Sequence, residues 1–173
     1  MAGGIFGFIL ITYVFKIVKG RISKNNMYCN IKININGKKL FTNVIIDTGN
    51  FLREPITKTP VIVIEKDELI NIVPEYILGN LDKIIIGKDL DLGEYASKVR
   101  IIPFKSLGRE NGILLGLKAD GVIVELEENS INIKNVIIGI YSGTLSKMGK
   151  YHGLIGMDII EGKDIDDLIY EKL

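Results

Sequence analysis

One acidic residue of the sequence stands where a side chain could do chemistry. Asp47 directly follows the apolar run 44–46 and is followed by Thr48 and Gly49. An acid at this place leaves a strand and enters a turn, where Thr48 can hydrogen-bond to neighbouring backbone and Gly49 lets another backbone approach. A carboxylate held in such a turn can accept or donate a proton. A solvated surface turn also explains the triplet alone, so its interpretation depends on the elements around it.

The composition excludes several other kinds of site. The chain of 173 residues has one cysteine, Cys29, and one histidine, His152. It therefore offers neither a disulfide framework nor a multi-histidine or cysteine-rich metal centre. Sequence motifs for phosphate, dinucleotide or zinc binding and for a serine nucleophile turn are missing. The 22 Lys and Arg residues balance 21 Asp and Glu residues, so we expect no nucleic-acid partner. His152 is interpreted as a histidine of a surface turn.

Short apolar segments separated by turn residues predict a mostly β domain. Residues 28–46 alternate between apolar and polar around Asn36-Gly37, which is the strongest short-range signal for a hairpin. Further strands are expected at 61–64, 84–86, 99–102, 113–117, 121–126, 131–133 and 136–140, with a helical turn at 65–72. Only the tail, 157–173, offers a plausible helix of greater length. Many short strands at this spacing favour a small all-β domain of the barrel type.

The N-terminal segment differs from the rest of the chain. Residues 1–15 carry no charge, and Lys16, Lys19, Arg21 and Lys24 then follow closely. A membrane-spanning helix needs about 20 apolar residues, and basic residues just after a span mark its cytoplasmic side. We therefore expect residues 1–24 to be the end of a membrane anchor with a basic juxtamembrane segment, and a longer membrane region to precede it. A buried N-terminal helix or strand is the alternative.

Two segments together resemble the retropepsin-type aspartic proteases. The first is the apolar-apolar-Asp-Thr-Gly run, and the second is Leu154-Ile155-Gly156 followed by the helix-like tail. Residues 136–139 are a second candidate for the apolar-apolar-Gly element, but the tail favours Leu154–Gly156. Residues 47–61 also resemble the segment D-[ST]-G-N-x-L-x-[DE]-P-[IL]-[ST]-x-x-P-V of the sporulation sigma-E factor processing peptidases of endospore-forming bacteria. In that family a membrane-spanning N-terminal region is joined to a cytoplasmic aspartic protease domain.

The resemblance implies an all-β fold over residues 25–173, a retropepsin-like closed β-barrel with one short C-terminal helix, preceded by a short membrane-anchor helix. Asp47 would be the catalytic acid/base. Thr48 would lock two active-site loops together, Gly49 would admit the substrate backbone, and Leu154, Ile155 and Gly156 would pack beneath the Asp47 loop. Aspartic proteases use two carboxylates about 3 Å apart that share one proton. Because the chain has a single Asp-Thr-Gly, the active enzyme would be a two-fold homodimer. Water is the nucleophile, so no cofactor and no metal are expected.

A flap over the substrate is expected from the order of the elements. The polar, glycine-bounded turn that would form it comprises Ser106, Leu107, Gly108, Arg109, Glu110, Asn111 and Gly112. Such a hairpin would exclude water and hold the peptide. An ordinary surface hairpin explains the same pattern about equally well. Residues 67–97 look like an insertion relative to the viral enzymes.

The resemblance thus implies a membrane-anchored aspartic endopeptidase that processes an inactive sigma-factor precursor during sporulation, with its protease domain on the cytoplasmic side of the cell membrane. Its partners would be a second copy of the chain, the precursor, the membrane and a signalling protein that activates it. Two alternatives stay open at this point. One is a membrane peptidase of the same type with another substrate, and the other is a non-catalytic dimerisation module of the same fold.

Overall fold

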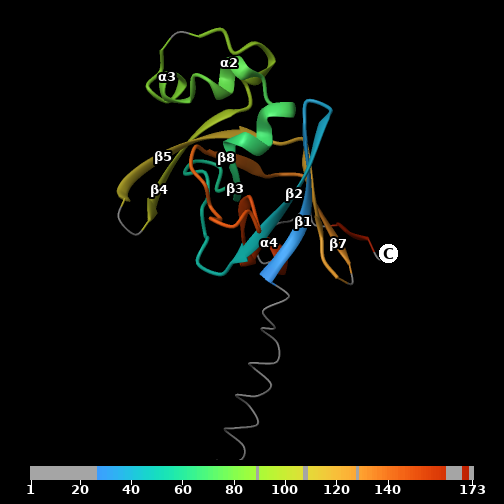
Figure 1. Cartoon of the computed structure of the whole chain (residues 1–173). Coiled ribbons are helices and arrows are strands. Elements are labelled where there is room, and N and C mark those ends of the chain that lie inside the picture. Colours follow the sequence, from blue (N-terminus) through green and yellow to red (C-terminus); the bar gives the residue numbers. More distant parts are fainter. Residues whose placement is uncertain (1–26, 89, 107–108, 128, 163–168, 172–173) are drawn as a thin grey trace, which may run out of the picture.

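The computed structural model describes residues 27–88, 90–106, 109–127, 129–162 and 169–171 (Figure 1). The strands are β1 (Tyr28–Ile35), β2 (Lys38–Asp47), β3 (Val61–Glu65), β4 (Val99–Ser106), β5 (Arg109–Lys118), β6 (Gly121–Glu125), β7 (Ser130–Ile133), β8 (Ile137–Tyr141), β9 (Gly153–Gly156) and β10 (Ile169–Glu171). The helices are the 3-10 helices η2 (Lys66–Asn71) and η3 (Gly93–Tyr95) and the α-helices α2 (Glu75–Leu78), α3 (Leu81–Ile85) and α4 (Met157–Glu161).

All ten strands belong to one sheet, so the expectation of a mostly β domain is confirmed. Their order is β10-β7-β6-β1-β2-β9-β3-β8-β5-β4. The pairs β2–β9 and β3–β8 are parallel, and the other neighbours are antiparallel. Within the described residues, β10 and β4 end the ladder and pair with one neighbour each. The closure of a barrel therefore stays a prediction.

The expected hairpin at 28–46 is confirmed. β1 pairs with β2 from Tyr28↔Ile45 to Ile35↔Lys38, and the two residues between them have positive φ, 50° at Asn36 and 74° at Gly37. Both angles suit a two-residue turn that matches the twist of the strands. Alternate residues of β1 enter the core, where the isoleucines at 31, 33 and 35 are at most 1% exposed. This hairpin fixes the direction in which β2 carries its last residue, Asp47.

The strand expected at 61–64 is also confirmed, as part of β3. All five residues of β3 are buried. β3 lies between β8 and β9, so both of its edges are paired and both of its faces are covered. The apolar run 61–64 is what such a position requires, and the strand ends at the buried Glu65.

The strand expected at 84–86 is wrong, because residues 84 and 85 end the helix α3. This helix belongs to a helical insert, residues 66–95, whose described part also contains η2, α2 and η3. The buried positions Ile77, Leu78, Leu81 and Ile84 recur at helical spacing, whereas Asp82 and Lys83 are exposed. Three apolar residues alone cannot separate a strand from a helix. Figure 1 shows this helical insert at one end of the domain, at the top of the view, above β4 and β5.

The tail differs from the expected helix. α4 ends after five residues because Gly162 takes the left-handed conformation, with φ 67°. Residues 169–171 form strand β10, paired with β7, and residues 163–168 lie outside the described part of the chain. A short C-terminal helix is thus confirmed, and helix beyond it at 169–171 is not.

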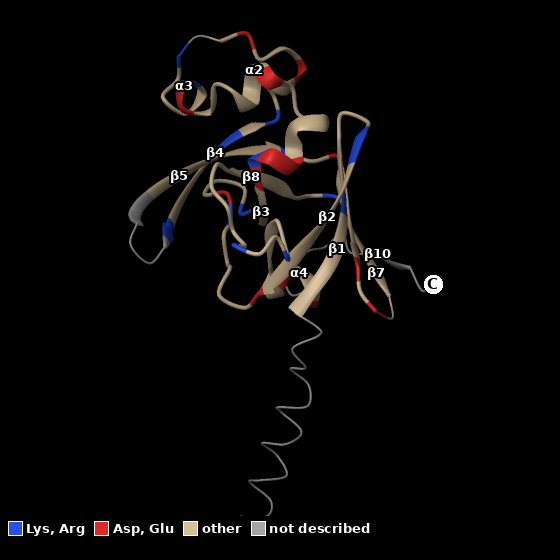
Figure 2. Cartoon of the chain, in the orientation of Figure 1, with Lys and Arg blue, Asp and Glu red and all other residues tan. Residues whose placement is uncertain are grey.

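The membrane-anchor prediction falls on residues 1–24, which lie outside the described residues. Among the residues that are described, no helix is both long and apolar enough to cross a bilayer. Figure 2 shows lysines and arginines interspersed with acidic residues over the visible face of the domain.

Candidate active site

Asp47 is the last residue of β2, and local hydrogen bonds fix its carboxylate in a turn. The backbone N–H of Gly49 donates to Asp47 Oδ1 at 2.9 Å, and the N–H of Asn50 donates to the Asp47 carbonyl oxygen at 3.1 Å. Asp47 is half-buried, whereas Thr48 and Gly49 are exposed. The carboxylate is therefore held at the surface end of a strand whose preceding residue, Ile46, belongs to the core.

β9 lies parallel to β2 directly beside the Asp47 turn. The register pairs Ile45 with Leu154, Ile46 with Ile155 and Asp47 with Gly156. Residues 137–139, from the alternative apolar-apolar-Gly segment, pair with β3 and β5 instead. The structure therefore places Leu154–Gly156 against the Asp47 strand; their supporting role in catalysis stays a prediction.

Gly156 is the point of closest packing between the Asp47 turn and α4. A Cβ atom on Gly156 would collide with the carbonyl oxygen of Asn50 and with Oδ1 of Asp158. Only glycine lets the turn and the first residues of α4 come this close. Any side chain here would separate the Asp47 turn from the strand that supports it.

An ion pair ties the loop after Asp47 to α4. The guanidinium of Arg53 contacts Oδ2 of Asp158, and its Nη1 also donates to the carbonyl of Lys58 at 3.1 Å. The side chains are 22% and 13% exposed, so water screens the pair only in part. Asp158 lies in the first turn of α4, where an acid is expected. The sequence gives no local signal for its partner, because the two residues are 105 positions apart.

The rest of that loop is fixed by Glu54, which is only 3% exposed. Its carboxylate accepts hydrogen bonds from the backbone N–H and the hydroxyl of Thr57, at 2.5 and 2.6 Å. The hydroxyl bond of Thr57, together with the backbone bond, lowers the pKa of the Glu54 carboxyl below its ordinary value. The acidic position and the hydroxyl position of the segment quoted above are therefore the two ends of one turn.

A cavity of about 640 Å³ opens beside Asp47. Its walls come from the Asp47 loop, from β3 and β9, and from the β4–β5 hairpin opposite. The residues that line it are Asp47, Gly49, Asn50, Phe51, Leu52, Val63, Phe104, Lys105, Leu114, Tyr141, Leu145 and Leu154. Several of these belong to the smaller apolar core around Val61 and Ile102. A mostly apolar cavity that is lined by one carboxylate suits the side chains of a peptide.

The hairpin opposite Asp47 is formed by β4 and β5, whose pairing runs from Val99↔Leu117 to Ser106↔Arg109. Of the expected flap residues, Leu107 and Gly108 lie outside the described part of the chain, and the side chains of residues 106–111 do as well. Gly112 pairs with Phe104, whose ring occupies the space of a Gly112 Cβ atom. The hairpin is thus found and faces the cavity through Phe104; its closing over a substrate stays a prediction.

His152 forms a hydrogen bond with Glu65, which its interpretation as a histidine of a surface turn does not predict. Its Nδ1 lies 2.8 Å from Glu65 Oε2, although its side chain is 33% exposed. The Glu65 hydrogen bond raises the pKa of His152 above its ordinary value. Burial raises the pKa of Glu65, but the hydrogen bonds from His152 and from the backbone N–H of Leu145 outweigh it and lower that pKa. Because Leu145 lines the Asp47 cavity, this pair holds one wall of the site.

Within the described ranges, no group of three or more His, Cys, Asp or Glu residues could hold a metal ion. The polar groups available at the cavity are the carboxylate of Asp47, the amide of Asn50, the amine of Lys105 and the phenol of Tyr141, on an otherwise apolar surface.

A mostly β domain in which Asp47, Gly49 and residues of the β4–β5 hairpin line one largely apolar cavity has the layout expected of a peptidase site. The chain belongs to the sporulation factor SpoIIGA family of peptidases, whose profile matches residues 1–159.

Two relatives carry the same name, sporulation sigma-E factor-processing peptidase. The protein of Priestia megaterium is 32% identical over 163 residues, which cover 90% of this chain and 53% of the relative. The protein of Bacillus subtilis is 31% identical over 150 residues, which cover 83% of this chain and 48% of the relative. The chain therefore spans about half the length of these relatives. No solved structure matches it significantly.

Proposed function

We propose that this chain is an aspartic endopeptidase in which Asp47 acts together with Asp47 of a second copy of the chain. The observation that carries the proposal is the position of Asp47. It is the last residue of β2 and lines a largely apolar cavity of about 640 Å³. The β4–β5 hairpin forms the opposite wall through Phe104, Lys105 and Leu114. A peptide lying in this cavity would pass between the carboxylate and the hairpin.

A second copy would supply the carboxylate that one chain lacks. The Asp47 turn is exposed at Thr48 and Gly49, and the loop that follows it exposes two large apolar side chains, Phe51 at 66% and Ile56 at 87%. Large apolar side chains exposed on the loop beside a site are candidates for an interaction surface. An isologous contact about a two-fold axis would bring the two Asp47 turns together and cover these residues.

The reaction of such a pair is hydrolysis of a peptide bond. Two carboxylates about 3 Å apart share one proton, because two negative charges at that distance repel each other. The ionised carboxylate takes a proton from water as the water oxygen attacks the carbonyl carbon. The protonated carboxyl gives its proton to the carbonyl oxygen, so a tetrahedral diol forms. The proton taken from water then passes to the leaving nitrogen as the bond between carbon and nitrogen breaks, and one hydroxyl of the diol returns a proton to the other carboxylate. The N–H of Gly49 on Asp47 Oδ1 keeps the carboxylate in place throughout.

The substrate proposed for this chain is the precursor of the sporulation factor sigma-E, because the relatives are named for its processing. We also propose that residues 1–24 anchor the chain in the cell membrane and that the domain lies on its cytoplasmic side. The sign of the charges after residue 15 supports that orientation. A signalling protein that acts through further membrane segments is the proposed activator.

The test is cleavage of the sigma-E precursor on co-expression with this chain, followed by gel mobility. Asp47→Asn keeps the size of the side chain and removes its charge, so it is expected to lower the cleavage rate by about 10²–10⁴-fold. Asp67→Asn, a change at an exposed acid of η2, is the matched control and is expected to cleave as the wild type does. Full activity of Asp47→Asn would refute the proposal.

The dimer is tested separately with the purified chain in detergent. Below the dissociation constant of the dimer, the initial rate is expected to rise with the square of the protein concentration. A rate that stays proportional to concentration over the whole range would contradict a site shared between two copies.

A further inference from the structure

A second hollow lies between the helical insert and the β4–β5 hairpin. It measures about 580 Å³ and is lined by α3 on one side and by β5 and the end of β8 on the other. Leu81 and Ile85 of α3 face Ile113 and Leu115 of β5 across it. Apolar side chains of α3 and β5 thus line a space that the core of the domain does not fill, and Asp82, Ser142 and the backbone of Gly143 make the rest of its surface polar.

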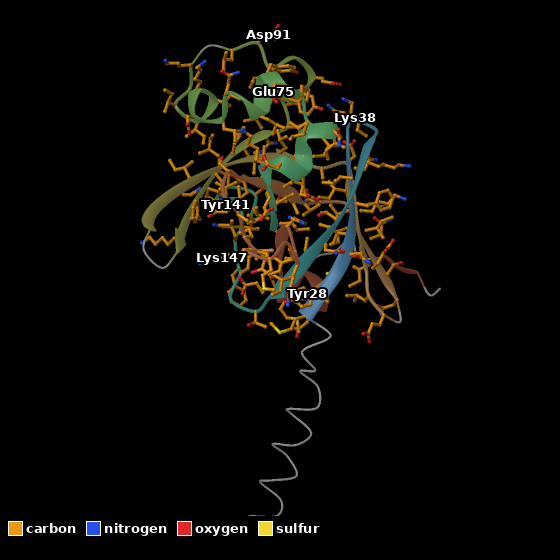
Figure 3. The ribbon with its side chains drawn as sticks, in the orientation of Figure 1. Tyr28, Lys38, Glu75, Asp91, Tyr141 and Lys147 are labelled. Carbon is orange, nitrogen blue, oxygen red and sulfur yellow. The ribbon has the colours of Figure 1, made fainter. Side chains whose placement is uncertain are left out.

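This hollow adjoins the Asp47 cavity. Leu114 and Tyr141 line both of them. The reason lies in the sheet, because the pairing of β5 with β8 ends at Leu115↔Ile140. Beyond that pair the two strands have no common ladder, so Leu114 and Tyr141 form a shared wall with the Asp47 cavity on one side and the insert on the other. Figure 3 labels Tyr141 at this place, between the insert and the lower part of the domain.

The surface of the hollow includes an exposed apolar side chain, Ile113, and an exposed carboxylate, Asp82. Ile113 is 50% exposed although its neighbours in β5 are buried. Asp82, on the first turn of α3, is exposed at the rim and makes no ion pair within the described residues. An apolar side chain next to a basic one would satisfy both features, because the first removes Ile113 from water and the second neutralises Asp82.

The position of the hollow favours a soluble polypeptide as its occupant. Figure 3 places Glu75 and Asp91 of the insert region at one end of the domain and Tyr28, at the start of β1, at the other. The chain therefore enters the described domain at the end remote from the insert. A membrane held by residues 1–24 would lie on the Tyr28 side, so the insert that lines the hollow would lie at the end of the domain remote from it.

We propose that the hollow between α3 and β5 binds a segment of the protein substrate outside the cleaved bond. This inference rests on the proposed function. An apolar side chain of that segment packs between Ile85 and Ile113, and a neighbouring lysine or arginine pairs with Asp82. The substrate is then held at two places, at the scissile bond by the Asp47 cavity and at a distant segment by the insert. Selection of a whole folded precursor, rather than of a short sequence, is the consequence.

The experiment compares two substrates of the full chain in detergent. One is the intact sigma-E precursor, and the other is a peptide of about eight residues around its processing site, which spans at most about 28 Å when extended. The quantity measured is the ratio of kcat/KM for the precursor to kcat/KM for the peptide. Because the same folded molecules cleave both substrates, a loss of folded protein does not change this ratio.

Asp82→Lys and Ile113→Glu are each expected to lower the ratio about tenfold, which is the effect of one lost contact of this kind. The matched controls are Glu75→Lys, an exposed acid of the same insert, and Ile70→Glu, an isoleucine that is 56% exposed. Neither control residue lines the hollow, and both variants are expected to keep the wild-type ratio.

An unchanged ratio in both Asp82→Lys and Ile113→Glu would overturn the inference, and so would an equal fall in the two control variants. The proposed function is tested in the same assay by Asp47→Asn on the short peptide. Continued cleavage of the peptide by that variant would refute the proposed function, whatever the ratio does, so the two failures are distinguishable.

Discussion

Gly156 offers the sharpest test of how the site is held together. Gly156 pairs with Asp47, and the space for its Cβ atom is taken by Asn50 O and Asp158 Oδ1. The Asn50 oxygen belongs to the backbone of the Asp47 turn, so it cannot rotate away as a side chain does. In Gly156→Ala, either β9 must move from β2 or the turn that carries Asp47 must move.

The expected loss of stability in Gly156→Ala follows from the crowding around the added methyl group. Inserting a methyl group into a filled site costs about 1–3 kcal/mol. The smaller conformational freedom of alanine in the unfolded chain returns about 0.4–1 kcal/mol. A net loss of about 1–2 kcal/mol lowers the melting temperature by about 2–8 °C for a domain of this size. Because the displaced turn carries the carboxylate, cleavage is expected to fall about 100-fold in the molecules that remain folded.

The assay combines thermal melting with precursor cleavage per folded molecule. Gly121→Ala is the control, because the nearest atom to its added Cβ would be Ile133 O at 3.6 Å, an ordinary contact. That variant is expected to melt and cleave as the wild type does. If Gly156→Ala matched the wild type in both measurements, the packing argument would be wrong. If it lost stability alone, β9 would absorb the strain and the coupling to Asp47 would be refuted.

Three further predictions concern the interactions around the site. In His152→Ala, the loss of stability relative to the wild type is expected to be about 0.3–1 kcal/mol between pH 4.5 and 6.5 in urea unfolding. Because the pKa of His152 is raised, this contribution is lost as pH rises through the folded-state pKa above 6.5. Because the pKa of Glu65 is lowered, it is also lost as pH falls through the folded-state pKa below 4.5. A difference in stability that is independent of pH would contradict the assignment. Arg53→Ala is expected to cost about 1–3 kcal/mol, with Asp158→Ala adding little to it in the double variant, and full additivity of the two changes would show that the pair is not coupled. Burial raises the pKa of the Cys29 thiol to about 12, so alkylation by iodoacetamide at pH 8 is expected to be about a thousandfold slower in the native protein than in urea, and equal rates would place Cys29 at the surface.

Local patterns of the sequence predicted the parts of the fold that depend on near neighbours. The turn at Asn36-Gly37 follows from two residues that tolerate positive φ, and the alternation on either side of it sets which face of β1 is buried. The run 61–64 of β3 was recognisable because a strand covered on both faces favours consecutive apolar residues. The place of Asp47 at the end of a strand followed in the same way.

Sequence reasoning failed where a short segment was interpreted without its neighbours. The apolar residues 84–86 fit a strand equally well on their own, and only the packing of Leu81 and Ile84 against the core makes the segment a helix. For the same reason the tail was predicted as helix, whereas residues 169–171 form strand β10, which pairs with the edge of β7.

The sequence by itself determined which residue of this protein could carry acid and base chemistry, because residue type and strand position are local properties. Only the tertiary structure decided what surrounds that residue. Arg53 meets Asp158 across 105 positions and Glu65 meets His152 across 87, and neither pair leaves a mark in the nearby sequence. The cavity beside Asp47 is likewise built from loops and strands far apart in the chain. Such contacts arise when a sheet buries its apolar faces, and burial brings together residues that no local pattern connects.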